Sequence, residues 1–154
     1  MVVLLFFAVN FTGCTPAGVQ VVQVKGRMTH NGQPLDGASV TFSPTTHEGR
    51  EASGLTNANG EFVVLTQGAT KSGCMPGSYR VSVTKNIAVD RHGNPLVFVV
   101  SDDPHAPPPA GLESGERPTM KSVIPEKYGN AETSGLTAEV TKKGPNSFVF
   151  ELTE

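Results

Sequence analysis

The side chains best suited to chemistry are few in this chain and lie apart from one another. The four histidines fall in turns and loops, and no two of them have the spacing of a zinc site: His30, His47, His92 and His105. The sequence also lacks a Gly-x-Ser-x-Gly stretch, which presents a nucleophilic serine between a strand and a helix. These residues predict no catalytic group and no cofactor, and they favour a protein that is not an enzyme.

Two stretches carry enough oxygen ligands for a metal ion to be considered. In TNANGE, Asn57, Asn59 and Glu61 alternate, but a hard divalent cation generally needs more than one carboxylate, so a hairpin turn is the favoured interpretation. The second stretch combines carboxylates and imidazoles in one loop region: Asp90, His92, Asp102, Asp103 and His105. Acidic loops are commonly just solvated, so we predict no metal site. An alternative function stays open, a metal-assisted enzyme of the cell envelope that uses His92–His105.

An apolar run opens the chain and ends at a cysteine, in MVVLLFFAVNFTGC. The run from about Val2 to Phe11 is too short to cross a bilayer as a helix, which needs about 20 apolar residues. It has the length of the apolar part of a secretory signal. Thr12-Gly13-Cys14 resembles the lipobox of bacterial lipoproteins, in which the cysteine is lipidated and becomes the new N-terminus. An N-terminal core strand is the alternative interpretation.

The lipobox resemblance implies a signal peptide over residues 1–13, lipid attachment at Cys14 and a short tether over 14–20. It therefore implies an exported protein anchored to a membrane of the bacterial cell envelope, at the outer membrane or the periplasmic face. With Cys14 lipidated, Cys74 has no partner for an internal disulfide, and we expect a small, partly buried loop residue there. Nucleic acid is not an expected partner, because the net charge is -2 and no run of Lys or Arg occurs.

The remaining elements are predicted by alternation of apolar and polar residues with a period of two. Such alternation is typical of strands that have one face on a core. The residues expected to point inward are Val22, Val24, Gly26 and Met28; Ala38, Val40 and Phe42; Phe62 and Val64; Tyr79, Val81 and Val83; Leu136, Ala138 and Val140; and Phe148, Phe150 and Leu152. Turn signals such as Asn31-Gly32 and Asn59-Gly60 separate the segments. The sequence thus predicts an all-β protein, a single antiparallel β-sandwich of about seven strands.

One region interrupts this pattern. Seven of the twelve prolines fall between Pro95 and Pro125. Proline removes a backbone donor from a ladder, and consecutive prolines favour extended polyproline geometry. We therefore expect a long proline-rich loop insert, disordered over residues 101–122.

Three stretches resemble, in order, the carboxypeptidase regulatory-like domain, a transthyretin-like β-sandwich of secreted bacterial proteins: VKGRMTHNGQPLDGASVTFSP, SGLTNANGEFVV and PGSYRVSV. The matching positions are Gly26, Gly32, Pro34, Leu35, Gly37, Thr56, Gly60, Phe62, Pro76, Gly77 and Tyr79. The tail, IPEKYGNAETSGLTAEV followed by NSFVFEL, is similar to the ending of short lipoproteins that carry this domain. The resemblance implies a transthyretin/prealbumin-like domain over residues 21–154 that acts as a non-catalytic accessory module.

The matching residues are expected to hold the fold. Glycine accepts positive φ at turns, and the hydroxyl of Tyr79 is expected to reach a backbone group at the rim of the sandwich. Expected ligands are a carbohydrate, a peptide strand added to a sheet edge, or a protein partner at the envelope. A covalent crosslink between Lys25 and Asn146 is disfavoured, because Lys25 falls on the polar face of its strand.

Overall fold

The computed structural model describes residues 19–97, 112 and 117–154. Within them the chain forms short strands and one four-residue 3-10 helix, which confirms the prediction of an all-β protein. The elements are β1 (Val24–His30), β2 (Gln33–Pro34), β3 (Ser39–Pro44), β4 (Ala52–Leu55), β5 (Glu61–Val63), β6 (Leu65–Thr66), β7 (Gly77–Thr84), β8 (Asn86–Val89), β9 (Thr119–Ser122), η1 (Glu126–Gly129), β10 (Leu136–Val140) and β11 (Asn146–Leu152). The described strands outnumber the predicted seven because some of them are very short: β2 and β6 have two residues each. No described helix is long and apolar enough to cross a membrane.

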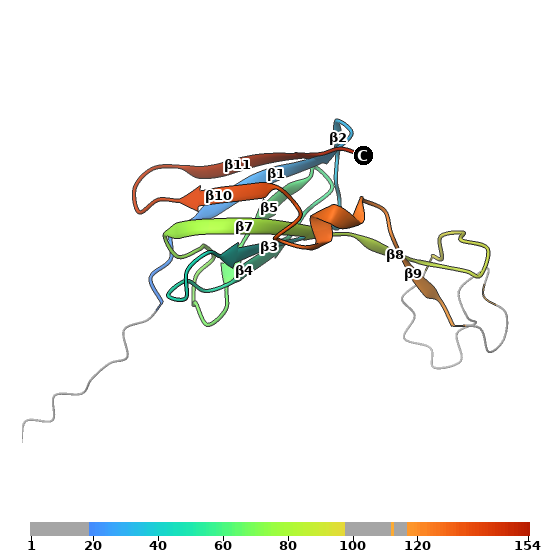
Figure 1. Ribbon diagram of the computed structural model, residues 1–154, viewed down its shortest axis with the longest axis horizontal. Coiled ribbons are helices and arrows are strands. Elements are labelled where there is room, and N and C mark those ends of the chain that lie inside the picture. The colour runs from blue at the N-terminus through green and yellow to red at the C-terminus, as the bar shows by residue number, and fades with distance from the viewer. Residues whose placement is uncertain (1–18, 98–111, 113–116) are drawn as a thin grey trace, which may run out of the picture.

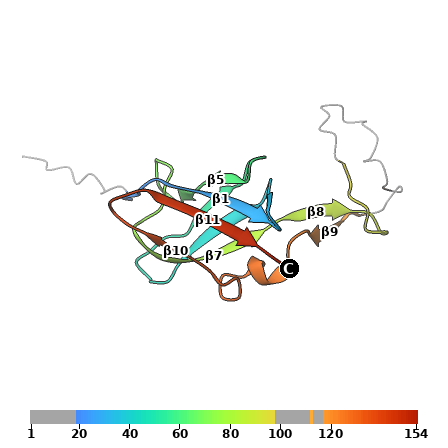
Figure 2. The ribbon, with the colours of Figure 1, turned by 90° about the horizontal axis from the view of Figure 1, so that it is seen from above.

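Two sheets pack face to face, which confirms the predicted sandwich (Figure 1). One sheet has the order β11-β1-β2, and β5 pairs with the same edge of β1 as β2 does. The other has the order β10-β7-β3-β4-β6. Seen from above, β11 and β1 lie over β10 and β7, so the first and last strands of the fold are neighbours in one layer (Figure 2).

One ladder departs from the antiparallel prediction. β1 and β11 run parallel, from Val24 opposite Asn146 to His30 opposite Leu152, whereas the other ladders between described strands are antiparallel. The physical reason is the path of the chain. β10 belongs to the opposite sheet, so the chain crosses the sandwich between β10 and β11. Such a crossing does not impose the antiparallel direction that a tight hairpin within one sheet imposes.

The predicted inward faces form the core. Val24, Val40, Val81 and Val83 are completely buried, and the other inward positions are buried or half-buried. Phe42 of β3 lies at the centre, where four rings surround it with centroid separations of 6.0–6.4 Å: Phe62, Tyr79, Phe148 and Phe150. Each such side chain stabilises the fold by about 1.5–3 kcal/mol.

Two predicted turns have different roles in the structure. Asn31 and Gly32 both have positive φ, 51° and 77°, as a type I′ turn requires, and they join β1 to β2 as a hairpin. The turn before Phe62 does not close a hairpin, which corrects the expectation for the TNANGE stretch. β4 pairs within the five-stranded sheet and β5 with β1 in the other sheet, so this turn carries the chain between layers.

A two-stranded ribbon of β8 and β9 projects from one end of the sandwich (Figures 1 and 2). Its register runs from Asn86 opposite Ser122 to Val89 opposite Thr119. The predicted disordered loop over 101–122 is therefore wrong at its C-terminal end. Prolines flank β9 at Pro118 and Pro125 but none lies inside it, so its backbone donors are available to β8. Residues 101–111 and 113–116 lie outside the described residues.

Candidate functional site

Of the residues of the possible metal loop, the structure describes Asp90 and His92. Asp102, Asp103 and His105 lie outside the described residues, as does Cys14. The Asp90 carboxylate accepts hydrogen bonds from the backbone N–H groups of His92 and Asn94, both at 2.8 Å, and from the Asn94 side-chain amide at 2.9 Å. Those bonds, chiefly from Asn94, lower the pKa of Asp90. Asp90 thus orders the turn after β8, and no three His, Cys, Asp or Glu side chains in residues 19–97, 112 and 117–154 are grouped to hold a metal.

The TNANGE stretch is a turn held by hydrogen bonds between its own residues. Asn57 Oδ1 accepts hydrogen bonds from the backbone N–H groups of Asn59 at 3.0 Å and Glu61 at 2.9 Å. The Asn57 amide donates to the Glu61 carboxylate at 3.4 Å. The side-chain oxygens of Asn57 and Glu61 thus accept hydrogen bonds from within the stretch, which is a turn but not one that closes a hairpin.

Most of the motif residues occupy structural positions. Gly26 lies in the middle of β1, Gly32 and Pro34 lie in the β1–β2 hairpin, and Gly37 precedes β3. Gly60 lies in the β4–β5 connection and Phe62 in the middle of β5. Pro76 directly precedes β7, and Gly77 and Tyr79 lie in its first residues. The Tyr79 hydroxyl donates to the Met75 carbonyl at 2.9 Å, which confirms the expected bond to the backbone.

Cys74 is completely buried, and the prediction of partial burial was wrong. The reason is its pairing with the start of the fold. Backbone hydrogen bonds join Cys74 and Val22 in both directions at 2.9 Å and draw this loop against the sandwich. Burial raises the pKa of the Cys74 thiol, although hydrogen bonds with Tyr79 and Thr66 oppose that rise. The thiol is structural in this position.

A shallow groove of about 640 Å³ lies on the exposed face of the four-stranded sheet. Lys25 and Arg27 of β1 lie along its floor, and the half-exposed Val63 of β5 and the exposed Val149 of β11 flank them. Arg27 Nε donates to the carbonyl of Asn59 at 3.2 Å, so the guanidinium is held in place. Sequence reasoning missed this groove. The sequence does show the polar-face residues that line the groove, but it does not show that their strands, such as β1 and β11, are neighbours.

The chemistry of this groove suits binding. Its lining supplies two cations, one carboxylate from Glu61 and exposed apolar side chains that include Leu55 and Val149. No histidine or cysteine lines it. A site of this composition can orient a charged or amphipathic ligand.

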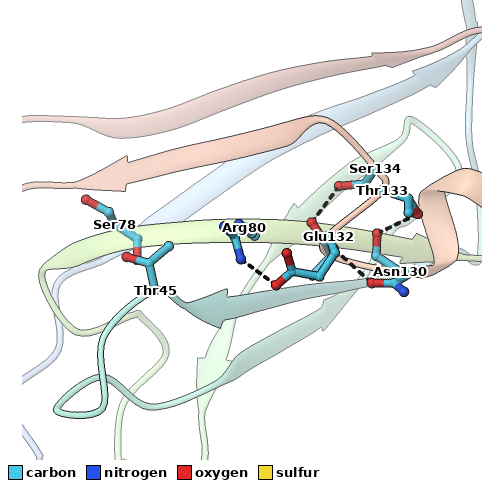
Figure 3. A network of polar contacts seen from close by, with 8 residues as sticks. Thr45, Ser78, Arg80, Asn130, Glu132, Thr133 and Ser134 are labelled. Carbon is cyan, nitrogen blue, oxygen red and sulfur yellow. Dashed lines mark hydrogen bonds and ion pairs between the residues drawn. The ribbon is translucent and has the colours of Figure 1, made fainter.

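A second polar cluster lies on the exposed face of β7 (Figure 3). The Arg80 guanidinium forms an ion pair with Glu132, and the Asn130 side chain accepts the Glu132 backbone N–H at 2.8 Å. Ser134 Oγ donates to the Val81 carbonyl at 2.6 Å. These contacts fasten the segment between η1 and β10 onto β7. Arg80 and Glu132 are both well exposed, so we interpret the cluster as a structural contact at the surface.

Comparison of the chain with protein-family models, with curated proteins and with solved structures gives no match. Function is therefore inferred from the sequence motifs and from the geometry above.

Proposed function

We propose that the protein is an exported lipoprotein of a bacterial cell envelope, anchored through Cys14, whose β-sandwich is a non-catalytic structural or ligand-binding module. One observation carries the proposal. Among the described residues, Val22 pairs with Cys74 through a β-bridge, Val24 belongs to the packed core, and the half-buried Val22 packs against that core. The sandwich therefore includes the chain from Val22 onward, and the lipobox motif calls for a tether over residues 14–20 before it.

We also propose that the sandwich belongs to the carboxypeptidase regulatory-like class, with a transthyretin-like fold. The support is the structural fit of the motif positions. Gly26 allows close packing at the centre of β1, Gly32 takes positive φ in a hairpin turn, and Tyr79 bonds the backbone beside Pro76. These three motif residues have roles in holding the fold, as expected for a scaffold domain.

Within this proposal the groove over Lys25 and Arg27 is the surface that would meet a ligand. Its elongated lining from β1, β5 and β11 fits a carbohydrate, an extended peptide or a protein partner at the envelope. No observation in the described residues favours the metal-assisted enzyme, because the Asp90 carboxylate already accepts three hydrogen bonds from its own turn.

Labelling with a fatty-acid analogue, followed by mass spectrometry of the mature N-terminus, tests the anchor. The wild-type chain should incorporate the label, begin at Cys14 and fractionate with membranes. Cys14→Ser should lose the label, whereas Cys74→Ser, which alters the buried thiol, should keep it. An unlabelled soluble chain that retains Met1 would refute the proposal.

A further inference from the structure

The last strand of the fold has an unpaired edge. In the described residues β11 pairs with β1 alone and is the terminal strand of its sheet. The N–H of Asn31 donates to the carbonyl of Leu152 at 2.9 Å, so Leu152 turns its backbone groups toward β1. Backbone direction alternates along a strand, so Ser147, Val149 and Glu151 turn their N–H and C=O groups to the opposite side. These groups form an available edge.

Two features limit this edge to a window of seven residues. At one end Pro145 has no N–H to donate. At the other end the Tyr128 hydroxyl donates to the Thr153 carbonyl at 3.1 Å and accepts from the Thr153 N–H at 3.0 Å, so the next backbone groups are already satisfied. The window is therefore β11 itself, Asn146–Leu152. Its central residue is Val149, 75% exposed, the most exposed of the large apolar side chains described.

We propose that two copies of this chain associate by antiparallel pairing of their β11 strands, with the two-fold axis at Val149. In that register Val149 lies opposite Val149 of the second copy, and Ser147 lies opposite Glu151 of the second copy. Pro145 meets Thr153 of the second copy, so the limits of the two windows coincide. A two-fold contact needs a self-complementary surface, and an axis at the central residue of the window lets all seven residues of each copy pair.

The charges on the exposed face fit the same register. Lys25 lies beside Ser147 in the β1–β11 ladder. A row across the proposed interface thus contains Lys25, the small Ser147 and then Glu151 of the second copy. The long lysine side chain can extend over the serine toward that carboxylate. Arg27 lies beside Val149, whose opposite residue is uncharged, so no like charges face one another across the axis.

Sedimentation equilibrium of the full chain in a density-matched neutral detergent tests the contact. The wild type should show a concentration-dependent dimer. Val149→Lys replaces the apolar pair at the axis with two ammonium groups that face each other, and it should raise the dissociation constant about two- to thirtyfold. The matched control is Leu65→Lys, which puts the same charge at an exposed apolar position of β6, at the edge of the other sheet, and it should leave the dimer intact. A monomeric wild type, or a dimer that Val149→Lys leaves unchanged, overturns the proposal. Association through any other part of the chain, including Val2–Phe11, gives that second result.

A charge exchange tests the register. Lys25→Glu and Glu151→Lys should each weaken the dimer about two- to tenfold, because each creates two like-charge contacts per dimer. The double variant restores opposite charges in both rows and should return the dissociation constant close to the wild-type value. A double variant that is at least as weak as the two single variants overturns the pairing about Val149.

Discussion

Replacing Gly26 by alanine should destabilise the sandwich more than any ordinary surface change. Gly26 lies in the middle of β1, between β5 on one side and β11 on the other. A Cβ added there would overlap Cζ of Phe62 and would lie 2.7 Å from the carbonyl oxygen of Phe148. Carbon atoms in contact are normally about 3.5–4.0 Å apart, so both neighbours would have to move.

The two neighbours differ in how easily they can move. The Phe62 ring can rotate, but it lies near Phe42 and Phe150, with centroid separations of 6.2 and 6.4 Å. The Phe148 oxygen belongs to the backbone of the β1–β11 ladder and can retreat only if the strands separate. Overpacking of a core typically costs about 1–3 kcal/mol, and the involvement of backbone places Gly26→Ala near the top of that range, at about 3 kcal/mol.

Equilibrium urea unfolding, followed by far-ultraviolet circular dichroism, measures this cost. The matched control is Gly129→Ala, whose Cβ would meet only Cγ2 of Thr84 at 3.7 Å, and it should change the unfolding free energy by less than about 0.5 kcal/mol. Phe62→Leu should cost less in the Gly26→Ala background than in the wild type, since it removes one of the two clashes. The inferred close packing of β1 is wrong if Gly26→Ala costs no more than the control, or if the two substitutions are additive.

Three further predictions concern other parts of the fold. Tyr128→Phe removes both hydrogen bonds to Thr153 and should lower the unfolding free energy by about 1–2 kcal/mol in urea titration; no loss would mean that water replaces the hydroxyl. The Cys74 thiol has its ordinary pKa of 9.0 in the unfolded chain and a raised pKa when buried, so the unfolding free energy should fall as pH rises above about 9. When the unfolding free energy is measured against pH, Cys74→Ala should show a smaller fall. Arg80→Ala breaks only the exposed pair with Glu132, so its cost should stay below about 1 kcal/mol and shrink in about 1 M salt; a larger, salt-independent cost would contradict this.

The inward faces could be predicted because the strand pleat is a local property. Successive side chains on a strand point to opposite faces, so the alternation through Tyr79, Val81 and Val83 is enough to say which residues meet a core. Each of the three is buried. The Asn31-Gly32 turn was equally predictable, since two consecutive residues with positive φ have a strong sequence preference.

The assignment of strands to sheets could not be predicted in the same way. The segments around Thr56 and Phe62 look like the two arms of a hairpin, yet β4 and β5 belong to different sheets. Nothing within a turn records whether the chain returns along the same layer or crosses to the other, because that choice depends on partners far away in the sequence. The parallel pairing of β1 with β11 is undetermined locally for the same reason.

The candidate groove was missed because it needs that same long-range information. Lys25 and Ser147 each read as an ordinary solvated position on the polar face of a strand, and Val149 as a single apolar exception. Only the register between β1 and β11 makes Lys25 and Ser147 neighbours and sets Val149 beside Arg27. Because β1 and β11 lie more than a hundred residues apart in the sequence, neither strand alone indicates the surface that they form together.

The unprotected edge of β11 and the proposed lipid anchor are physically related. Soluble proteins commonly protect an edge strand with a lysine or a proline, and the window Asn146–Leu152 contains neither. Seven residues of pairing form a small interface, which would be weak between copies that diffuse freely in solution. Copies held through Cys14 would share a membrane surface, and confinement of this kind raises the effective concentration of one edge near another. A weak edge contact would then suffice for pairing at the envelope. Wild-type and Cys14→Ser chains should therefore have similar dissociation constants in detergent, but the wild type should give the higher crosslinking yield in cells. Equal yields in cells would show that the anchor does not promote the edge contact.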